Sequence, residues 1–154
     1  MMASTEVVLT PTESKRLLSK AVLNRDEVKK ALQEGMVIVH PCSTSIFMLD
    51  ELGFKVHEQG IWICGHVSPK GLCMSRGILD ARTRPNWGPG SYCFEFVFRK
   101  GEYLPVEESA ISAVLEQVTE NDVFVKGVNA IDPAGKVGVL LAARSTGGSI
   151  GTIL

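Results

Sequence analysis

The strongest constraint on the fold is a continuous apolar run, Met36–His40, that lies between Gly35 and Pro41. A short apolar run without polar alternation suits a strand buried on both faces, as in a parallel sheet. Residues 12–34 before it show apolar positions at helical spacing, and residues 46–52 after it read as a helix closed by Gly53. The order helix, strand, turn, helix predicts an α/β protein.

The remaining pattern extends this prediction along the chain. The segment 24–27 interrupts the apolar stripe, so two helices are expected within 12–34. Thr12 or Ser14 would cap the first and Asn24 or Asp26 the second, with Gly35 ending it at the C′ position. The later elements are expected as strands at 54–57, 61–67, 93–98, 122–127 and 137–142, a helix at 106–118 and a long loop at 80–92.

These elements predict one domain over residues 1–154. Strands that alternate with helices favour a Rossmann-like three-layer α/β fold with a largely parallel sheet. Because residues 54–100 lack a clear helix, a few antiparallel strands are expected there.

Charge and hydropathy exclude several classes of protein. The chain has 16 Lys and Arg against 17 Asp and Glu, a net charge of −1, which argues against sequence-independent binding to nucleic acid. No apolar run approaches the roughly 20 residues of a membrane span. The N-terminus has no basic segment of a signal peptide, so a cytoplasmic location with reduced thiols is expected.

The cysteines and histidines predict no metal site and no cofactor. The residues are Cys42, Cys64, Cys73, Cys93, His40, His57 and His66. None of the cysteines form a C-x-x-C pair, and no two histidines have the spacing of a metal-binding pair on a helix. Buried thiols that act as small hydrophobic residues are the simpler interpretation.

One polar turn, Cys42–Ser45, lies between the buried strand and a helix. Ligands of open α/β sheets bind at the carboxyl ends of strands, and hydroxyl and N–H groups at a helix start favour an anion. Ser43, Thr44 and Ser45 are therefore candidate ligand-binding residues. Plain helix capping is the alternative.

Two further turns have similar chemistry. Gly147, Gly148 and Ser149 belong to a glycine-rich turn that lacks the lysine of a Walker motif. Gly127, Asn129 and Asp132 follow the strand at 122–127, where polar groups would lie at the carboxyl edge of the sheet. Ordinary turn chemistry, including an Asx turn into Pro133, is the alternative for both.

Two residues are candidates for catalysis. Cys42 is a candidate nucleophile whose thiolate a helix N-terminus would favour, and an inert buried cysteine is the alternative. Asp132 is the candidate acid or base.

Together the three turns resemble the NagB/RpiA/CoA-transferase-like superfamily. The residues that carry this resemblance are Gly35–Val39 with Ser43–Ser45, Asp122–Asp132 with Gly135–Val137, and Thr146–Gly151. The resemblance implies a Rossmann-like sheet and a ligand placed against these loops. Isomerases of this group carry an acidic residue where this chain has Asn129, and an amide cannot act as a general base.

The resemblance also bears on completeness and function. The chain stops where a further helix and strands would follow, so we expect either a truncated chain or a layer supplied by a partner in a homo-oligomer. The expected function is binding of a small anionic metabolite, phosphorylated, carboxylated or CoA-linked. The alternatives are an enzyme of the sugar-phosphate isomerase or CoA/acyl-transfer kind, and a non-catalytic assembly protein.

Overall fold

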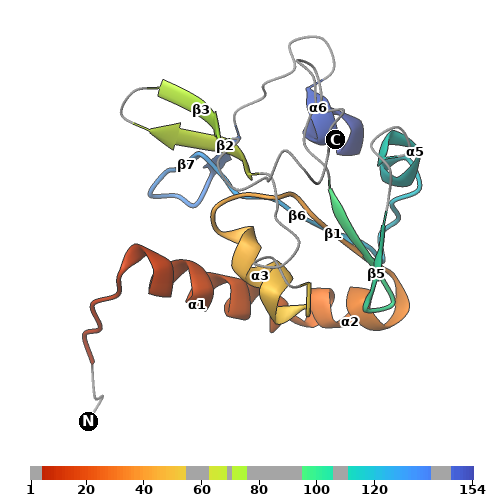
Figure 1. The fold of residues 1–154 in the computed structure, drawn as a ribbon, viewed down its shortest axis with the longest axis horizontal. Helices are drawn as coiled ribbons and strands as arrows, with labels where there is room; N and C mark the ends of the chain where they lie inside the picture. The colour runs from red at the N-terminus through yellow and green to blue at the C-terminus, as the bar shows by residue number, and fades with distance from the viewer. Residues whose placement is uncertain (1–4, 55–62, 69–70, 76–94, 106–110, 140–146) are drawn as a thin grey trace, which may run out of the picture.

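A computed structural model gives the structure of the chain, and it describes residues 5–54, 63–68, 71–75, 95–105, 111–139 and 147–154. In this part of the chain the helices are α1 (Pro11–Leu23), α2 (Asp26–Glu34), α3 (Ser45–Glu51), α5 (Ile111–Leu115) and α6 (Gly148–Ile153). The strands are β1 (Met36–Val39), β2 (Ile63–Ser68), β3 (Gly71–Ser75), β4 (Phe96–Arg99), β5 (Glu102–Leu104), β6 (Val123–Val125), β7 (Ala130–Ile131) and β8 (Val137–Gly138). The mixture confirms an α/β protein (Figure 1).

The largest described sheet has four strands in the order β5-β4-β1-β6. β1 pairs with β4 in antiparallel orientation and with β6 in parallel orientation, and β4 pairs with β5 antiparallel. One of the three pairings is thus parallel. A largely parallel, Rossmann-like sheet is therefore not confirmed in the described residues. The predicted antiparallel strands before residue 100 are confirmed.

Strand β1 is buried along its whole length because its alternate side chains enter two separate cores. Val37 and Val39 pack with α2 and α3, together with Phe96 and Phe98 of β4. Met36 and Ile38 pack on the other face, in a second core. This division explains why the run shows no polar alternation.

The second core lies beneath α5 and α6. It contains Met36, Ile38, Val97 and Leu115, with Ile153 of α6 packed against it. Helices therefore cover both faces of the sheet. Figure 1 shows α1–α3 on one side of the strands and α5 and α6 on the other.

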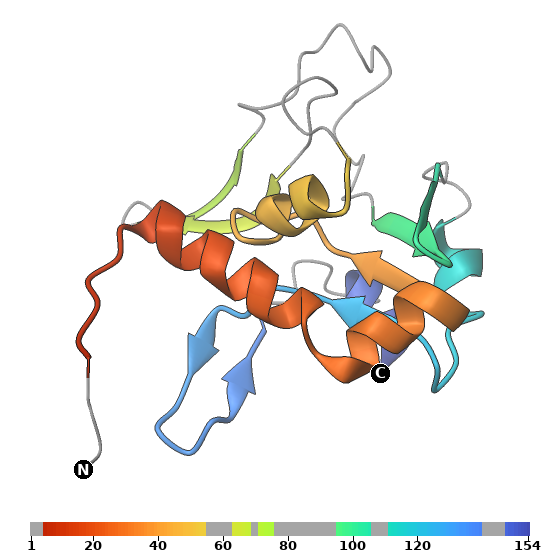
Figure 2. The same ribbon diagram turned by 90° about the horizontal axis from the view of Figure 1, so that it is seen from below.

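Two small hairpins complete the described fold. β2 and β3 pair with each other, and so do β7 and β8. The second hairpin projects from the body of the protein (Figure 2) and exposes Val128, Ile131 and Val137. The prediction of a buried strand at 137–142 is wrong for its first residues, because turn residues 132–136 fold them back on β7 in an exposed hairpin.

The helix starts differ from the predicted ones. Thr10 caps α1, rather than Thr12 or Ser14. Pro11 occupies the first helical position, so the helix begins earlier than predicted. Thr10 and Glu13 form a reciprocal capping box. The N-cap of α2 is Arg25, and no side chain caps this helix.

Glycines end two helices, for different reasons, and Gly35 is the C-cap of α2 rather than the C′ residue that the sequence predicts. Gly53 after α3 has a φ of +81°, which glycine adopts without strain. Gly35 after α2 has a φ of −123°, so freedom of φ is not its role. A Cβ at Gly35 would lie 2.7 Å from the carbonyl oxygen of Asn121 and 2.8 Å from Oδ1 of Asp122. Glycine is needed there for space.

Several sequence predictions lie outside the described residues. They are the strand at 54–57 beyond Phe54, the loop at 80–92, the first part of the helix at 106–118, the end of the strand at 137–142, and Cys93.

Candidate functional site

The parallel strands β1 and β6 end side by side, and the chain leaves both through polar or glycine-containing segments. The N–H of His40 donates a 2.9 Å hydrogen bond to the carbonyl of Val125 and so continues the pairing past β1. A Cβ placed on Gly127 would lie 3.0 Å from Sγ of Cys42. The structure therefore brings Gly127 of the second predicted turn against the first turn. We call residues 40–45 and Gly127 the β1–β6 edge.

Ser45 organises the turn between β1 and α3. Its hydroxyl donates to the carbonyl of His40 at 2.6 Å and accepts from the N–H of Cys42 at 2.8 Å. Its own N–H donates to Sγ of Cys42 at 3.4 Å. Ser45 is buried, so its hydroxyl has a structural role in this state of the protein. Thr44 is the N-cap of α3 but makes no side-chain capping bond.

Helix α1 supplies a positive charge to this turn. Nζ of Lys15 donates a 3.0 Å hydrogen bond to Oγ of Ser43 in a half-buried setting. The buried Ser19, one turn further along α1, donates to the carbonyl of Thr44 at 3.0 Å. The hydroxyl of Ser43 is thus held beside an ammonium group, although 28 residues separate the two in sequence.

Cys42 is a half-buried free thiol. Burial raises the pKa of Cys42, but hydrogen bonds from Ser45 and Thr44 and the charge of His40 lower it. The balance holds the pKa of this thiol below its ordinary value of 9.0. Hydrogen bonds and positive charge favour the thiolate, which is the nucleophilic form.

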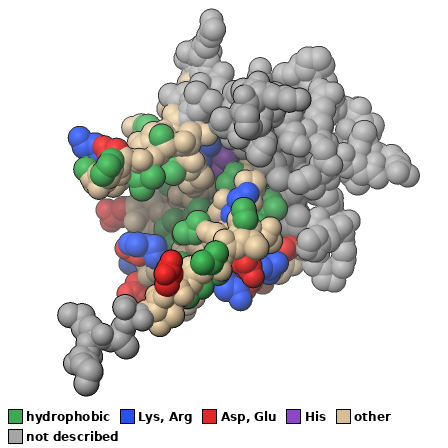
Figure 3. Space-filling view, turned by 90° about the vertical axis from the view of Figure 1, so that its left-hand side faces the viewer, with side chains coloured by type: hydrophobic (Ala, Val, Ile, Leu, Met, Phe, Trp, Pro, Cys, Tyr) green, Lys and Arg blue, Asp and Glu red, His purple; other side chains and the backbone are tan. Residues whose placement is uncertain are grey.

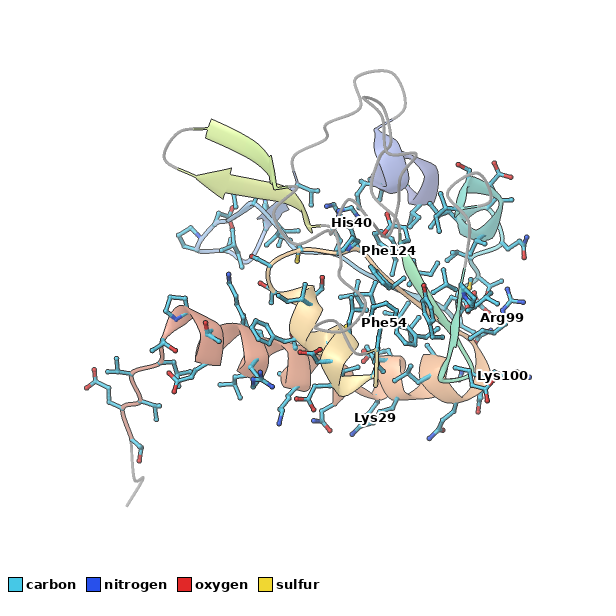
Figure 4. The ribbon with its side chains drawn as sticks, in the orientation of Figure 1. Lys29, His40, Phe54, Arg99, Lys100 and Phe124 are labelled. Carbon is cyan, nitrogen blue, oxygen red and sulfur yellow. The ribbon has the colours of Figure 1, made fainter. Side chains whose placement is uncertain are left out.

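His40, two residues before this thiol in the sequence, forms a buried pair with Glu95. Nδ1 of His40 lies 2.9 Å from Oε1 and 3.1 Å from Oε2 of Glu95. Their side chains are 6% and 0% exposed. Figure 4 places His40 past the carboxyl end of β1, with Arg99 and Lys100 at the opposite end of the sheet. Neither residue of this pair is among the site residues that the sequence predicts. A glutamate between two phenylalanines in a predicted strand was the available signal, since a buried carboxylate needs a partner.

The other residues of the second turn lie in the exposed β7–β8 hairpin. Oδ1 of Asp132 accepts from the N–H groups of Ala134 and Lys136, each at 2.9 Å. This is the geometry of an ordinary Asx turn, which is the alternative to a catalytic role for Asp132. Asn129 is exposed, and its N–H donates to the carbonyl of Gly138.

The third turn lies at the start of α6. Gly147 has a φ of +72° and is the N-cap of this helix, and Gly148 and Ser149 are its first residues. Since α6 packs on the face of the sheet opposite α3, the first and third predicted turns belong to helices on different faces.

The described residues contain no group of three or more His, Cys, Asp or Glu side chains placed to hold a metal ion. None of their helices has the length and hydropathy needed to cross a membrane. Basic and acidic side chains are interspersed with apolar ones over the described part of the face in Figure 3.

The chain matches no protein-family model, and it has no significant match among curated proteins or solved structures.

Proposed function

We propose that the β1–β6 edge binds a small anionic metabolite of the phosphorylated, carboxylated or CoA-linked class. The observation that carries this proposal is the contact between Lys15 and Ser43. A half-buried ammonium group and a hydroxyl beside the carboxyl ends of two parallel strands are the groups that would recognise a phosphate or carboxylate. The resemblance to NagB/RpiA/CoA-transferase-like proteins and a Rossmann-like fold are part of this proposal.

The position of Lys15 explains how the site would gain affinity. A lysine on an open surface interacts weakly with an anion because water and salt screen its charge. Lys15 is half-buried and already hydrogen-bonded to the turn, so less side-chain entropy remains to be lost on binding. An anion would take a second position on the same ammonium group, which has three donors.

A thermal-shift screen tests this proposal. The probes are inorganic phosphate, glucose 6-phosphate, acetate and acetyl-CoA. A probe at one hundred times its Kd would raise stability by about 2.7 kcal/mol. Lys15→Gln should weaken the binding of the responding probe about 10-fold or more, equal to about 1.4 kcal/mol.

Lys29→Gln is the matched control. It removes the same charge from the exposed face of α2, away from His40 and the end of β1 (Figure 4). Equal weakening by both variants would show a general charge effect and contradict the proposed site. No response to any probe class from folded protein would also contradict the proposal.

The lowered pKa of Cys42 favours a second candidate function, acyl transfer through this thiol. In such a reaction the thiolate attacks the acyl carbonyl carbon, a new C–S bond forms, and the bond to the leaving group breaks. With p-nitrophenyl acetate as probe, one acetyl group would be transferred to Cys42 and p-nitrophenolate released. Mass spectrometry of the tryptic peptide 31–55, in which Cys42 is the only cysteine, should show one added acetyl group in the wild-type protein and none in Cys42→Ser.

A further inference from the structure

The buried His40–Glu95 pair arises from the pairing of β1 with β4. Val39 is the register partner of Phe96 in this antiparallel pair. The next step along both strands places His40 opposite Glu95, where both side chains are buried. The two carboxylate oxygens lie at 2.9 and 3.1 Å from Nδ1 of His40.

Such a pair is a weak contributor to folding stability. Two ionisable groups lose their hydration on burial, and well-packed apolar residues at the same positions are often equally stable or more stable. The surrounding residues of β4 and β1, Val97 and Val39 among them, are apolar. A histidine and a glutamate at these positions therefore require an explanation other than packing.

His40 and Cys42 belong to one turn, whose backbone is held together by Ser45. Ser45 bonds to the carbonyl of His40 and to the N–H of Cys42, and its N–H donates to the sulfur. The charge of His40 lowers the pKa of Cys42. Among the other charged groups on the described elements around this turn, Lys15 of α1 is bonded to Ser43, Arg16 of α1 has its guanidinium carbon 5.0 Å from the centre of the Phe47 ring, and Lys126 follows β6.

We propose that Glu95 is a positioning residue that keeps His40 in its imidazolium form, two residues before Cys42, so that the Cys42 sulfur loses its proton at a lower pH than an ordinary thiol. A carboxylate accepts a hydrogen bond from the ring N–H and favours the charged ring. The charged ring in turn favours the charged sulfur. This inference rests on the second candidate function, thiol chemistry at Cys42, and names the residues that activate it.

The test is the pH profile of Cys42 alkylation by iodoacetamide. Trypsin releases residues 31–55 as one peptide in which Cys42 is the only cysteine, so mass spectrometry follows this thiol alone. Glu95→Gln should move the midpoint of the profile upward by about one pH unit, which is about a 10-fold loss of rate below both midpoints. His40→Asn should produce a shift in the same direction.

Glu102→Gln is the matched control, since it makes the same change on the exposed strand β5 and should leave the profile unchanged. A folded Glu95→Gln protein with the wild-type profile would overturn the role of Glu95 and leave the thiol function standing. A wild-type midpoint near the ordinary thiol value of 9.0 would overturn the thiol function itself.

A measurement on the wild-type protein covers the case in which Glu95→Gln does not fold. The ¹⁵N chemical shifts of the His40 ring, assigned through His40→Asn, distinguish the charged ring from the neutral one. The proposal requires the imidazolium form at pH 7. A neutral His40 ring at that pH would overturn it.

Discussion

The backbone N–H of Met36 donates a 2.7 Å hydrogen bond to Oδ1 of Asp122. The other carboxylate oxygen of Asp122 accepts from the N–H and the hydroxyl of Thr119, each at 2.8 Å. One side chain therefore joins the first residue of β1 to the turn that leads into β6. The bond from His40 to Val125 joins the same two strands at their other end.

Asp122→Ala should destabilise the protein by about 1–3 kcal/mol, because it leaves the N–H of Met36 without its acceptor in a part-buried setting. Urea unfolding followed by circular dichroism measures the change. Asp132→Ala, which removes a carboxylate from the exposed hairpin, should lower the free energy of unfolding by less. Equal losses in the two variants would contradict the role given to Asp122.

Gly127→Ala should reduce the alkylation rate of Cys42, because the new methyl group would meet the sulfur at 3.0 Å and one of the two must move. Overpacking of this kind costs about 1–3 kcal/mol of unfolding free energy. Gly138→Ala is the control, since its Cβ would lie at an ordinary 3.5 Å from the Cβ of Ala130. An unchanged alkylation rate in Gly127→Ala would show that the sulfur is not confined by this segment.

Phe54→Ala should destabilise the protein by about 3–5 kcal/mol. The ring is buried in the core beneath α2 and α3, and it contacts Phe96 and Tyr103 edge-on, with centroids 4.8 and 4.9 Å away. Thermal unfolding measures the loss. Val8→Ala, at a position that is 90% exposed, should change stability by less than about 0.5 kcal/mol. A loss below about 1 kcal/mol for Phe54→Ala would contradict this packing.

Thr10→Ala should lower stability by about 1 kcal/mol through loss of the N-cap of α1.

Hydrogen bonds from the side chain and the N–H of Thr10 lower the pKa of Glu13 below 4.5. The stabilising effect of Glu13 is therefore present above pH 4.5 and is lost as pH falls through the lowered folded-state value. Glu13→Gln should remove this part of the pH dependence of thermal unfolding, whereas Glu34→Gln should retain it. The same slope in Glu13→Gln and wild type would refute the assignment.

Sequence reasoning predicts best where one local signal decides the structure. β1 is such a case, because its apolar run is bounded by a glycine and a proline. Gly53 is another, since few residues other than glycine take its positive φ. The start of α1 was misassigned although Pro11 marks it, because hydroxyl residues at 12 and 14 offered equally plausible caps.

The candidate site depends on pairings that no local pattern reveals. His40 and Glu95 are 55 residues apart, and only the antiparallel register of β1 and β4 brings them together. The contact between Cys42 and Gly127 depends likewise on the parallel pairing with β6. Periodicity identified the strands but could not assign their partners, and for the same reason it could not distinguish the exposed β7–β8 hairpin from a buried strand.

The central position of β1 has a consequence for synthesis of the chain on the ribosome. Its two neighbours, β4 and β6, both follow it in sequence by a long interval. The nascent chain therefore carries an apolar strand with both edges open until β4 emerges, and with one edge open until β6 emerges. Exposed strand edges of this kind promote association between incomplete chains. The helices α2 and α3, made immediately before and after β1, are the described neighbours that can cover one face of that strand until β4 and β6 are made.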